Sequence, residues 1–268
     1  MRIVIKLGGT LLDQPKTLKA LASQIAALPA GAQPVVVHGG GKQMTKFLEE
    51  RGVESRFVNG LRVTTPEVLD AVLKIFAGSV NKQLVAALVA EGAPAVGLSG
   101  IDAKLAEAKP MRAELGAVGR IHRVNAELLE VLCDASYLPV VACVAGDSDG
   151  NIYNVNADQM ASALAVAFDA DRLIFLTDVE GVRGAGGAIL SHLTPDDAKK
   201  LISAGVATGG MQAKLEAACE AVDQGVSEVV IAPGAAPGIL DRLIAGESAG
   251  TLLSWNWEPE DVEEEEEE

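Results

Sequence analysis

The chain has 268 residues, which is enough for one large α/β domain or two lobes. Apolar residues make up 49% of it but aromatic residues only 3%, so the core must be built from Ala, Val, Leu and Ile, as in parallel sheets covered by helices. The formal net charge is −15, and the C-terminal stretch EPEDVEEEEEE holds nine of the 37 acidic residues. The 28 acidic and 22 basic residues that remain leave a charge of −6, which argues against a nucleic-acid-binding surface.

Several other classes of protein are disfavoured by the sequence. No uninterrupted apolar run reaches the ~18 residues that cross a bilayer, and a strand predicted from Arg2 onwards takes the place of a secretory leader. The three cysteines are widely spaced in apolar surroundings, which favours buried reduced thiols over a metal or redox site. We therefore expect a cytoplasmic protein with no membrane or nucleic-acid partner and no protein-bound metal. The acidic tail, residues 255–268, is expected to be disordered and to lie outside the fold.

Segments with strand-like and helix-like patterns alternate along the chain. Strands are predicted at 2–7, 34–38, 94–99, 138–145, 172–177, 227–232 and 250–254. Helices are predicted near 18–28, 44–48, 65–76, 79–91, 157–167, 196–205, 210–225 and 237–246. Residues 102–125 change character and predict an antiparallel hairpin. This order predicts an α/β fold, a three-layer αβα sandwich with a mostly parallel central sheet.

Two of the predicted strands run directly into glycines. Lys6 and Leu7 precede Gly8, Gly9 and Thr10, and His38 precedes the run 39–41. Neither stretch fits the Walker phosphate loop, but bare backbone N–H groups leading into a helix can bind an anion. The alternative is a pair of tight turns in which glycine is needed for a positive φ. Two such turns after neighbouring strands favour the anion site.

Two lysines and one aspartate are candidates for the chemistry. An unpaired buried ammonium is costly, so Lys6 at a strand end should face a cleft that holds an anion, unless its amine reaches the surface. Lys214 lies in the first turns of the helix opened by TGGM. Asp158 could hold both lysines in place or could simply interact with a helix dipole. Together these groups suit phosphoryl transfer. No Ser/His/Asp or Cys/His motif is evident, and a carboxylate acceptor, with a pKa near ~4, needs no general base.

From residue 2 to about 253 the chain resembles the N-acetylglutamate kinases of the amino acid kinase superfamily. The resemblance is carried, in the family's order, by IVIKLGG, VVHGGGKQ, NGLRVTTPE, GLSGIDA, ELGAVG, YLPVVACVA, NVNADQMASALA, LIFLTDVEGV and TGGMQAKLEAA. It implies one kinase domain, 1–254, with an amino-acid-binding lobe at about 1–170 and an ATP-binding lobe at about 171–254. The implied reaction is transfer of the γ-phosphoryl group of ATP, which brings Mg²⁺, to the side-chain carboxylate of N-acetyl-L-glutamate. This is the second step of arginine biosynthesis.

The resemblance also implies roles for individual residues. Lys6 and Lys214 would stabilise the phosphoryl group in transfer, with Asp158 organising them. Substrate binding would involve Gly9, Gly40, Gly41, Arg62 and Asn154, and ATP binding would involve Thr177, Asp178, Gly181, Val182, Gly210 and Met211. Without the family context, Arg62 could equally be a solvated arginine, Asn154 a turn residue and Asp178 a strand-end cap.

Some alternatives stay open at this point. The acceptor could be N-succinylglutamate or an aminoadipate derivative, although the latter branch usually departs from NGLRVT. A non-catalytic sensor of ATP or an amino acid is disfavoured because both lysines and Asp158 are present. The sequence starts at the first predicted strand and lacks the extra N-terminal helix of arginine-inhibited, hexameric members. We therefore expect a homodimer with weak or absent arginine inhibition.

Overall fold

The computed structural model describes residues 1–58 and 60–255. Its main sheet has eight strands in the order β12-β14-β13-β11-β1-β2-β8-β5, and all neighbours are parallel except β13 and β14. The strands are β1 (Arg2–Leu7), β2 (Gln33–His38), β5 (Ala95–Ser99), β8 (Leu138–Ala142), β11 (Arg172–Thr177), β12 (His192–Leu193), β13 (Glu228–Pro233) and β14 (Thr251–Leu253). Because β1, β2, β8 and β11 are buried on both faces, their residues are apolar except at or next to the strand ends.

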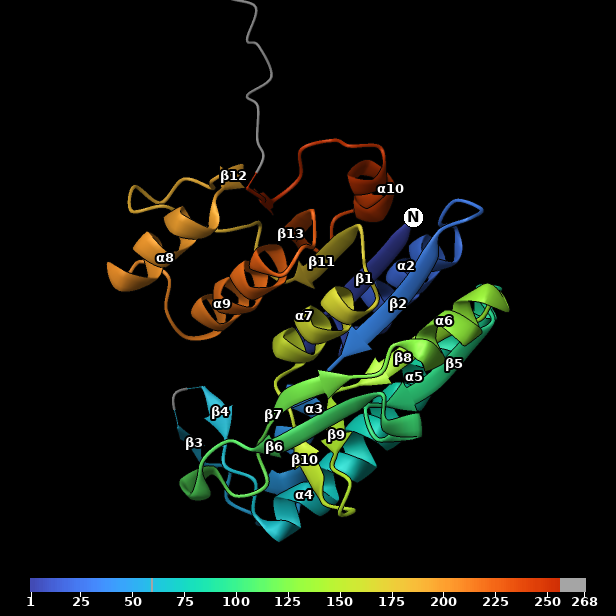
Figure 1. Cartoon of the computed structure of the whole chain (residues 1–268), viewed down its shortest axis with the longest axis vertical. Coiled ribbons are helices and arrows are strands. Elements are labelled where there is room, and N and C mark those ends of the chain that lie inside the picture. The colour runs from blue at the N-terminus through green and yellow to red at the C-terminus, as the bar shows by residue number, and fades with distance from the viewer. Residues whose placement is uncertain (59, 256–268) are drawn as a thin grey trace, which may run out of the picture.

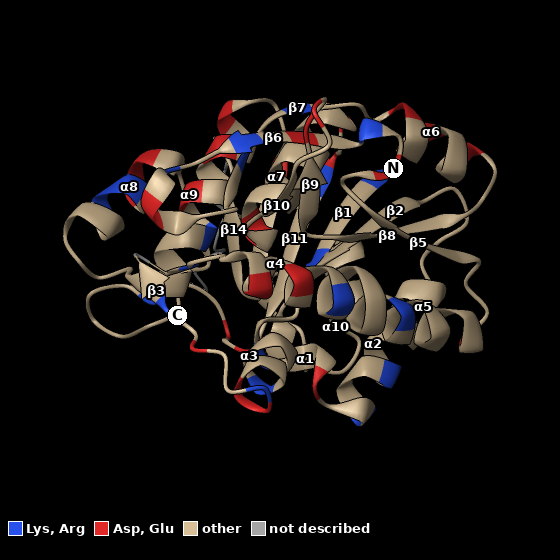
Figure 2. Ribbon diagram, turned by 90° about the horizontal axis from the view of Figure 1, so that it is seen from below, with Lys and Arg blue, Asp and Glu red and all other residues tan. Residues whose placement is uncertain are grey.

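Helices cover both faces of this sheet, and Figure 2 shows the three layers from the side. One layer contains α6 (Glu127–Asp134), α7 (Ala157–Ala167), α8 (Pro195–Ser203) and α9 (Gly209–Asp223). The other contains α1 (Gly9–Leu12), α2 (Pro15–Ala26), α3 (Gly41–Glu49), α4 (Pro66–Val72), α5 (Asn81–Ala90) and α10 (Ile239–Ile244). The predicted αβα sandwich with a mostly parallel sheet is confirmed.

Two smaller sheets lie near the carboxyl ends of the central strands (Figure 1). One has the order β10-β9-β6-β7 and includes the predicted hairpin, β6 (Ala106–Pro110) with β7 (Gly119–Val124). Its other strands are β9 (Val144–Gly146) and β10 (Ile152–Asn154). The second pairs β3 (Phe57–Val58) with β4 (Leu61–Arg62). Short 3₁₀ turns, η2 (Asp102–Lys104) and η3 (Ala113–Leu115), complete this region.

Two predictions about individual elements were wrong. The stretch 138–145 is not one strand, because the chain leaves the main sheet at Cys143 and continues as β9 of the smaller sheet. A uniformly apolar run does not reveal that change. The helices predicted at 65–76 and 79–91 are one continuous helix, in which α4 and α5 are joined by a π-helical segment, η1 (Leu73–Val80).

This continuous helix, Pro66–Ala90, is long and apolar enough by length and composition to cross a bilayer. A search for uninterrupted apolar runs does not detect it. Leu84 and Leu88 are almost fully buried, and α5 packs against α2 and the edge strand β5, as in a core helix of a globular domain. The acidic tail predicted to be disordered lies, apart from Trp255, outside the described residues.

Candidate active site

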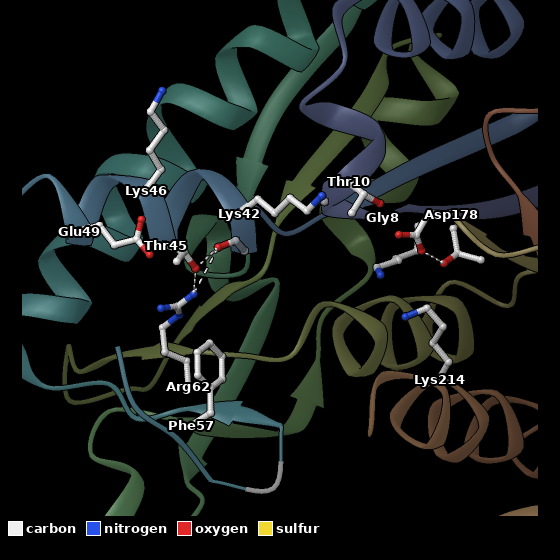
Figure 3. Close-up of a pocket in the computed structure, with 14 residues that line it drawn as sticks. Gly8, Thr10, Lys42, Thr45, Lys46, Glu49, Phe57, Arg62, Asp178 and Lys214 are labelled. Atoms are coloured by element: carbon white, nitrogen blue, oxygen red, sulfur yellow. Dashed lines mark hydrogen bonds between the residues drawn. The ribbon is translucent and has the colours of Figure 1, made fainter. Parts of the chain in front are cut away.

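A pocket of about 550 Å³ lies at the carboxyl ends of β1 and β11, where ligands bind in open α/β sheets. Its walls come from the two glycine turns and from α3, β3, β4 and α9, which are far apart in sequence. Figure 3 shows Lys214 and Asp178 at one end, Arg62 and Phe57 at the other, and Lys42 between them. The remaining lining residues are Lys6, Gly8, Gly9, Thr10, Gly41, Thr45, Lys46, Glu49 and Thr177.

At one end of the pocket a single carboxylate joins the two lysines singled out from the sequence. The Lys6 Nζ lies 2.6 Å from Asp158 Oδ1, and the Lys214 Nζ lies 3.3 Å from Asp158 Oδ2. Lys6 and Asp158 are both almost fully buried, although Lys6 lines the pocket. The two amines therefore open onto one shared cavity.

The fold places these three groups from three different elements. Lys6 is the penultimate residue of β1, which lies between β11 and β2 in the middle of the sheet. Asp158 lies in the first turn of α7, where the Asn156 side chain caps the helix by accepting hydrogen bonds from the N–H groups of Asp158 and Gln159. Lys214 lies in the second turn of α9, which packs against α7.

Burial and charge act in opposite directions on this cluster. Burial acts to raise the pKa of Asp158, but the ammonium groups of Lys6 and Lys214 outweigh it and leave the pKa below its usual value. The pKa of Lys214 is lowered, chiefly by burial and next by the charge of Lys6, while Asp158 acts in the opposite sense. The carboxylate is therefore ionised at neutral pH, and two cations share one anion.

The glycine turns lie next to each other beside this cluster. A Cβ atom added to Gly9 would lie 3.5 Å from the backbone N of Gly41, and no atom lies within 4 Å of the Cβ position of Gly41. The Gly8 N–H donates to the carbonyl of Leu176, 2.8 Å away. None of the five glycines in the two turns has a left-handed φ, so the alternative of tight turns that need a positive φ is wrong. Because Gly9 and Gly41 have no side chains, a ligand can approach their backbone from the pocket.

At the other end of the pocket Arg62 carries a buried guanidinium. It donates to the hydroxyl groups of Ser55 and Thr45, the latter at 2.7 Å, and to the carbonyl of Gly41 at 3.3 Å. The guanidinium also stacks on the ring of Phe57, with its Cζ 4.6 Å from the ring centroid. Desolvation lowers the pKa of Arg62, and no carboxylate within residues 1–58 and 60–255 pairs with it. A buried, forked cation with only neutral partners has the geometry and charge that suit a carboxylate.

The other residues predicted for substrate binding support the pocket from outside its lining. Asn154, on β10, donates from its Nδ2 to the Thr64 hydroxyl at 3.1 Å, just beyond the strand that carries Arg62. Gly40 packs so closely that a Cβ atom would lie 2.9 Å from the Phe76 ring. The Asn154 side chain and the Cβ side of Gly40 therefore face neighbouring protein groups rather than the open space of the pocket.

The residues predicted to bind ATP divide in the same way. Thr177 and Asp178 line the pocket. Val182 is buried, and its N–H donates to the Thr251 hydroxyl at 2.8 Å. Gly181 precedes it, and Gly210 and Met211 lie in the first turn of α9, the helix that carries Lys214. These four are not among the residues that line the pocket.

The sequence did not indicate Phe57 and Thr45, which line the pocket, or Ser55, whose hydroxyl accepts a hydrogen bond from Arg62. Thr45 lies four residues after Gly41 and donates to its carbonyl at 2.9 Å. Helical spacing from the glycine turn could therefore have indicated Thr45. Nothing in the sequence indicates Phe57, because its contact with Arg62 depends on the β3–β4 pairing.

Comparison with known proteins settles the family. The sequence profile of the amino acid kinase family matches residues 1–233. The chain belongs to this family. It is 60% identical over 254 residues to an acetylglutamate kinase from Solibacter usitatus, and the match covers 94% of this chain and 99% of that protein. An acetylglutamate kinase from Methanopyrus kandleri is 45% identical over 238 residues, with 85% of this chain and 93% of the relative covered.

Solved structures show the same amino acid kinase fold. A protein from Streptococcus mutans UA159 superposes with a TM-score of 0.81 and 31% identity, covering 95% of this chain and 99% of the other. An N-acetylglutamate synthase from Neisseria gonorrhoeae, complexed with coenzyme A and N-acetyl-glutamate, superposes with a TM-score of 0.84 and 26% identity. The match covers 96% of this chain but only 60% of that one.

Proposed function

We propose that this protein is an ATP-dependent kinase that phosphorylates the side-chain carboxylate of N-acetyl-L-glutamate, in arginine biosynthesis. The relatives named acetylglutamate kinase, at up to 60% identity over nearly the whole chain, support this reaction. The observation that carries it is the arrangement of charge in the pocket. At one end lies an arginine that pairs with no carboxylate of the described residues, and at the other lie two lysines joined by one aspartate. A dicarboxylate can satisfy both ends at once.

In this proposal Arg62 binds the α-carboxylate of the amino acid, and Asn154 supports the strand that carries Arg62. The side-chain carboxylate then lies near Lys6 and the amides of Gly9, Gly40 and Gly41. One of its oxygens forms a bond to the γ-phosphorus while the bond from that phosphorus to the β,γ-bridging oxygen breaks, and ADP leaves. The acceptor is already ionised, so no proton has to be removed.

Lys6 and Lys214 stabilise the charge on the phosphoryl group during transfer. Their shared contact with Asp158 sets their separation before substrate arrives, so little reorganisation is needed in the transition state. Thr177, Asp178, Gly181, Val182, Gly210 and Met211 are proposed to hold the nucleotide.

Mg²⁺ is proposed to arrive with ATP. Magnesium prefers oxygen ligands and is usually bound through substrate phosphates with one or two carboxylates. Within residues 1–58 and 60–255, no group of three or more His, Cys, Asp or Glu side chains could hold a metal ion. A nucleotide-borne ion fits that donor set better than an ion held by the protein alone.

The assembly and the location of the protein are also proposed. We propose a cytoplasmic homodimer, in which residues of about 1–170 form the amino-acid-binding lobe and residues of about 171–254 the ATP-binding lobe. The long apolar helix Pro66–Ala90 is only partly buried within one chain, and apolar surface of this kind favours contact with a second copy. Light scattering on the purified protein tests the dimer, and a monomeric mass would contradict it.

The reaction is tested by trapping its product. Purified protein is mixed with Mg-ATP, hydroxylamine and N-acetylglutamate, and formation of the hydroxamate is measured. Parallel reactions contain N-succinylglutamate, aspartate or glutamate. We expect N-acetylglutamate to give the highest kcat/KM. A higher value with N-succinylglutamate would change the proposed acceptor, and no product with any acceptor would favour a sensor without catalytic activity.

A further inference from the structure

His38 lies at the end of β2, directly before the second glycine turn, and the mechanism above does not use it. Its side chain is fully buried. The Nδ1 lies 2.8 Å from the carbonyl oxygen of Gly39, and the Nε2 lies 3.0 Å from the amide nitrogen of Asn81. The ring therefore connects the glycine turn with the long helix behind it.

The neighbours of Asn81 determine which ring nitrogen carries the proton. The Asn81 Nδ2 lies 2.9 Å from the carbonyl of Val140 and 3.4 Å from that of Leu98. Carbonyl oxygens only accept hydrogen bonds, so this side of the amide must be its NH₂ donor. The Nε2 of His38 then accepts from Asn81, and the proton lies on Nδ1 and is donated to the Gly39 carbonyl. Burial, with a smaller contribution from Lys82, lowers the pKa of His38 to about 4, so the ring is neutral at neutral pH.

This hydrogen bond sets the orientation of one peptide group. In a planar trans peptide the C=O and N–H groups point in opposite directions. Holding the Gly39 carbonyl against the buried ring therefore turns the Gly40 N–H away from the protein interior. No group among the described residues accepts a hydrogen bond from that N–H. A fixed and unused backbone donor beside Gly41, which lines the pocket, is available to a ligand.

The π-helical segment η1 brings the supporting side chains to one face. A Cβ atom on Gly40 would lie 2.9 Å from the Phe76 ring and 3.2 Å from Val80, while Asn81 reaches His38. An α-helix turns about 100° per residue, which would separate positions 76 and 81 by about 140°. The wider π-helix turns only about 80° per residue and separates them by about 40°. The Asn81 N–H accordingly bonds to the Phe76 carbonyl, five residues earlier.

We propose that His38 and Asn81 are positioning residues that hold the Gly39–Gly41 turn so that the Gly40 N–H donates to the phosphoryl group or the attacking carboxylate. The π-helical segment is the structural feature that lets the helix pack behind Gly40 and bind His38 at the same time. This inference rests on the proposed function for its catalytic consequence, but the hydrogen-bond relay itself does not depend on it.

A pair of amide substitutions separates positioning from simple packing. Asparagine places its NH₂ group close to the position of Nδ1 and can still donate to Gly39, whereas glutamine reaches the position of Nε2 and cannot. We expect His38→Gln to lower kcat by roughly 10–100-fold and to change KM for both substrates by less than about threefold. The reason is that the Gly40 N–H would be misaligned, and this donor is proposed to act mainly in the transition state. We expect His38→Asn to restore kcat to within about threefold of the original enzyme. Equal kcat values for the two variants, high or low, overturn the proposal.

The relay is also tested without any activity measurement. The chain has three histidines, so ¹⁵N-histidine labelling with long-range ¹H–¹⁵N correlation spectra resolves each ring, and His38→Asn assigns the missing signal. We expect His38 to carry its proton on Nδ1 and not to titrate between pH 6 and 8. A proton on Nε2, or titration near the ordinary pKa, overturns the relay. If the original enzyme phosphorylates none of the acceptors, the proposed function fails while this spectrum still decides the relay.

Discussion

The two ends of the pocket are built in different ways. At the lysine end, Asp158 contacts Lys6 and Lys214 at once, so opposite charges meet within the protein itself. At the arginine end, the guanidinium of Arg62 is held, among the described residues, only by neutral groups, namely two hydroxyls and the Gly41 carbonyl. The lysine end is therefore arranged before a ligand arrives, whereas the arginine end lacks the anion that would complete it.

This difference shows how one pocket can bind two kinds of anion, a carboxylate that stays bound and a phosphoryl group that is transferred. A carboxylate that stays through the reaction is bound best by an incomplete ion pair, because it supplies the missing charge. A phosphoryl group in transfer is stabilised best by charges whose positions do not change. The predictions below test the two ends separately, beginning with the largest expected effect.

Replacing Asp158 removes the carboxylate that contacts both lysines of the cluster. We expect Asp158→Asn to lower the free energy of unfolding by about 3–5 kcal/mol, because the buried ammonium of Lys6 and the partly buried ammonium of Lys214 lose their shared counter-ion. Urea denaturation at pH 7 measures this. The matched control is Asp178→Asn, an exposed acid at the same pocket, which should change the unfolding free energy by less than about 0.5 kcal/mol. Equal stability of the two variants would show that the cluster is not held by charge.

Replacing Lys214 should affect the rate and spare the fold, because Asp158 and Lys6 remain as a balanced pair. We expect Lys214→Ala to lower kcat by roughly 10²–10³-fold, or about 3–4 kcal/mol of transition-state stabilisation. Steady-state kinetics with hydroxylamine trapping measure it. Lys199→Ala on the neighbouring helix α8, where the lysine is exposed, is the control. A fall in kcat of less than about threefold would remove Lys214 from the mechanism.

At the arginine end the expected effect is on substrate binding. Arg62→Ala should raise KM for N-acetylglutamate by roughly 10–100-fold and leave KM for ATP nearly unchanged, since a charge-assisted pair contributes about 1.5–3 kcal/mol. Arg62→Lys keeps the charge but loses the fork and should recover only part of the affinity. The exposed Arg51, which stacks on Phe47, provides the control Arg51→Ala. A change in KM for ATP alone would show that Arg62 acts on the nucleotide and not on the amino acid.

The buried neutral ring of His38 makes the free energy of unfolding depend on pH. The pKa of His38 is lowered from 6.5 to about 4, so below pH 6.5 the unfolded chain binds a proton that the folded protein does not. The stabilisation is complete above pH 6.5 and is lost as the pH falls towards 4. Between pH 7 and 5 we expect the original protein to lose ~2 kcal/mol more unfolding free energy than His38→Asn. Urea denaturation measures this. If the original protein and His38→Asn lost the same unfolding free energy between pH 7 and 5, His38 would not be a buried neutral histidine.

Much of the candidate site could be read from the sequence where chemistry and local structure coincide. Lys6 and the two glycine turns follow apolar strands directly, so their place at the carboxyl ends of a parallel sheet follows from the pattern alone. Arg62 was harder, because its partners on α3 and on the β3–β4 pair meet it only in the folded chain. The role of Asn81 could not be predicted at all. The hydrophobic spacing in residues 66–90 predicts two α-helices. A π-helical segment cannot be distinguished from an α-helix by a search for apolar residues with a period of 3.6.

The sequence by itself determined the layers of the fold and the identity of the charged groups, because burial of apolar strands and exposure of glycine amides are local consequences of residue type. Only the tertiary structure decided which charges meet. Lys6, Asp158 and Lys214 come from β1, α7 and α9, and the packing of those elements brings the two amines to opposite oxygens of one carboxylate. Packing likewise decided that no acidic side chain among the described residues pairs with Arg62 and that Asn81 reaches the His38 ring, since both depend on contacts between segments distant in the chain.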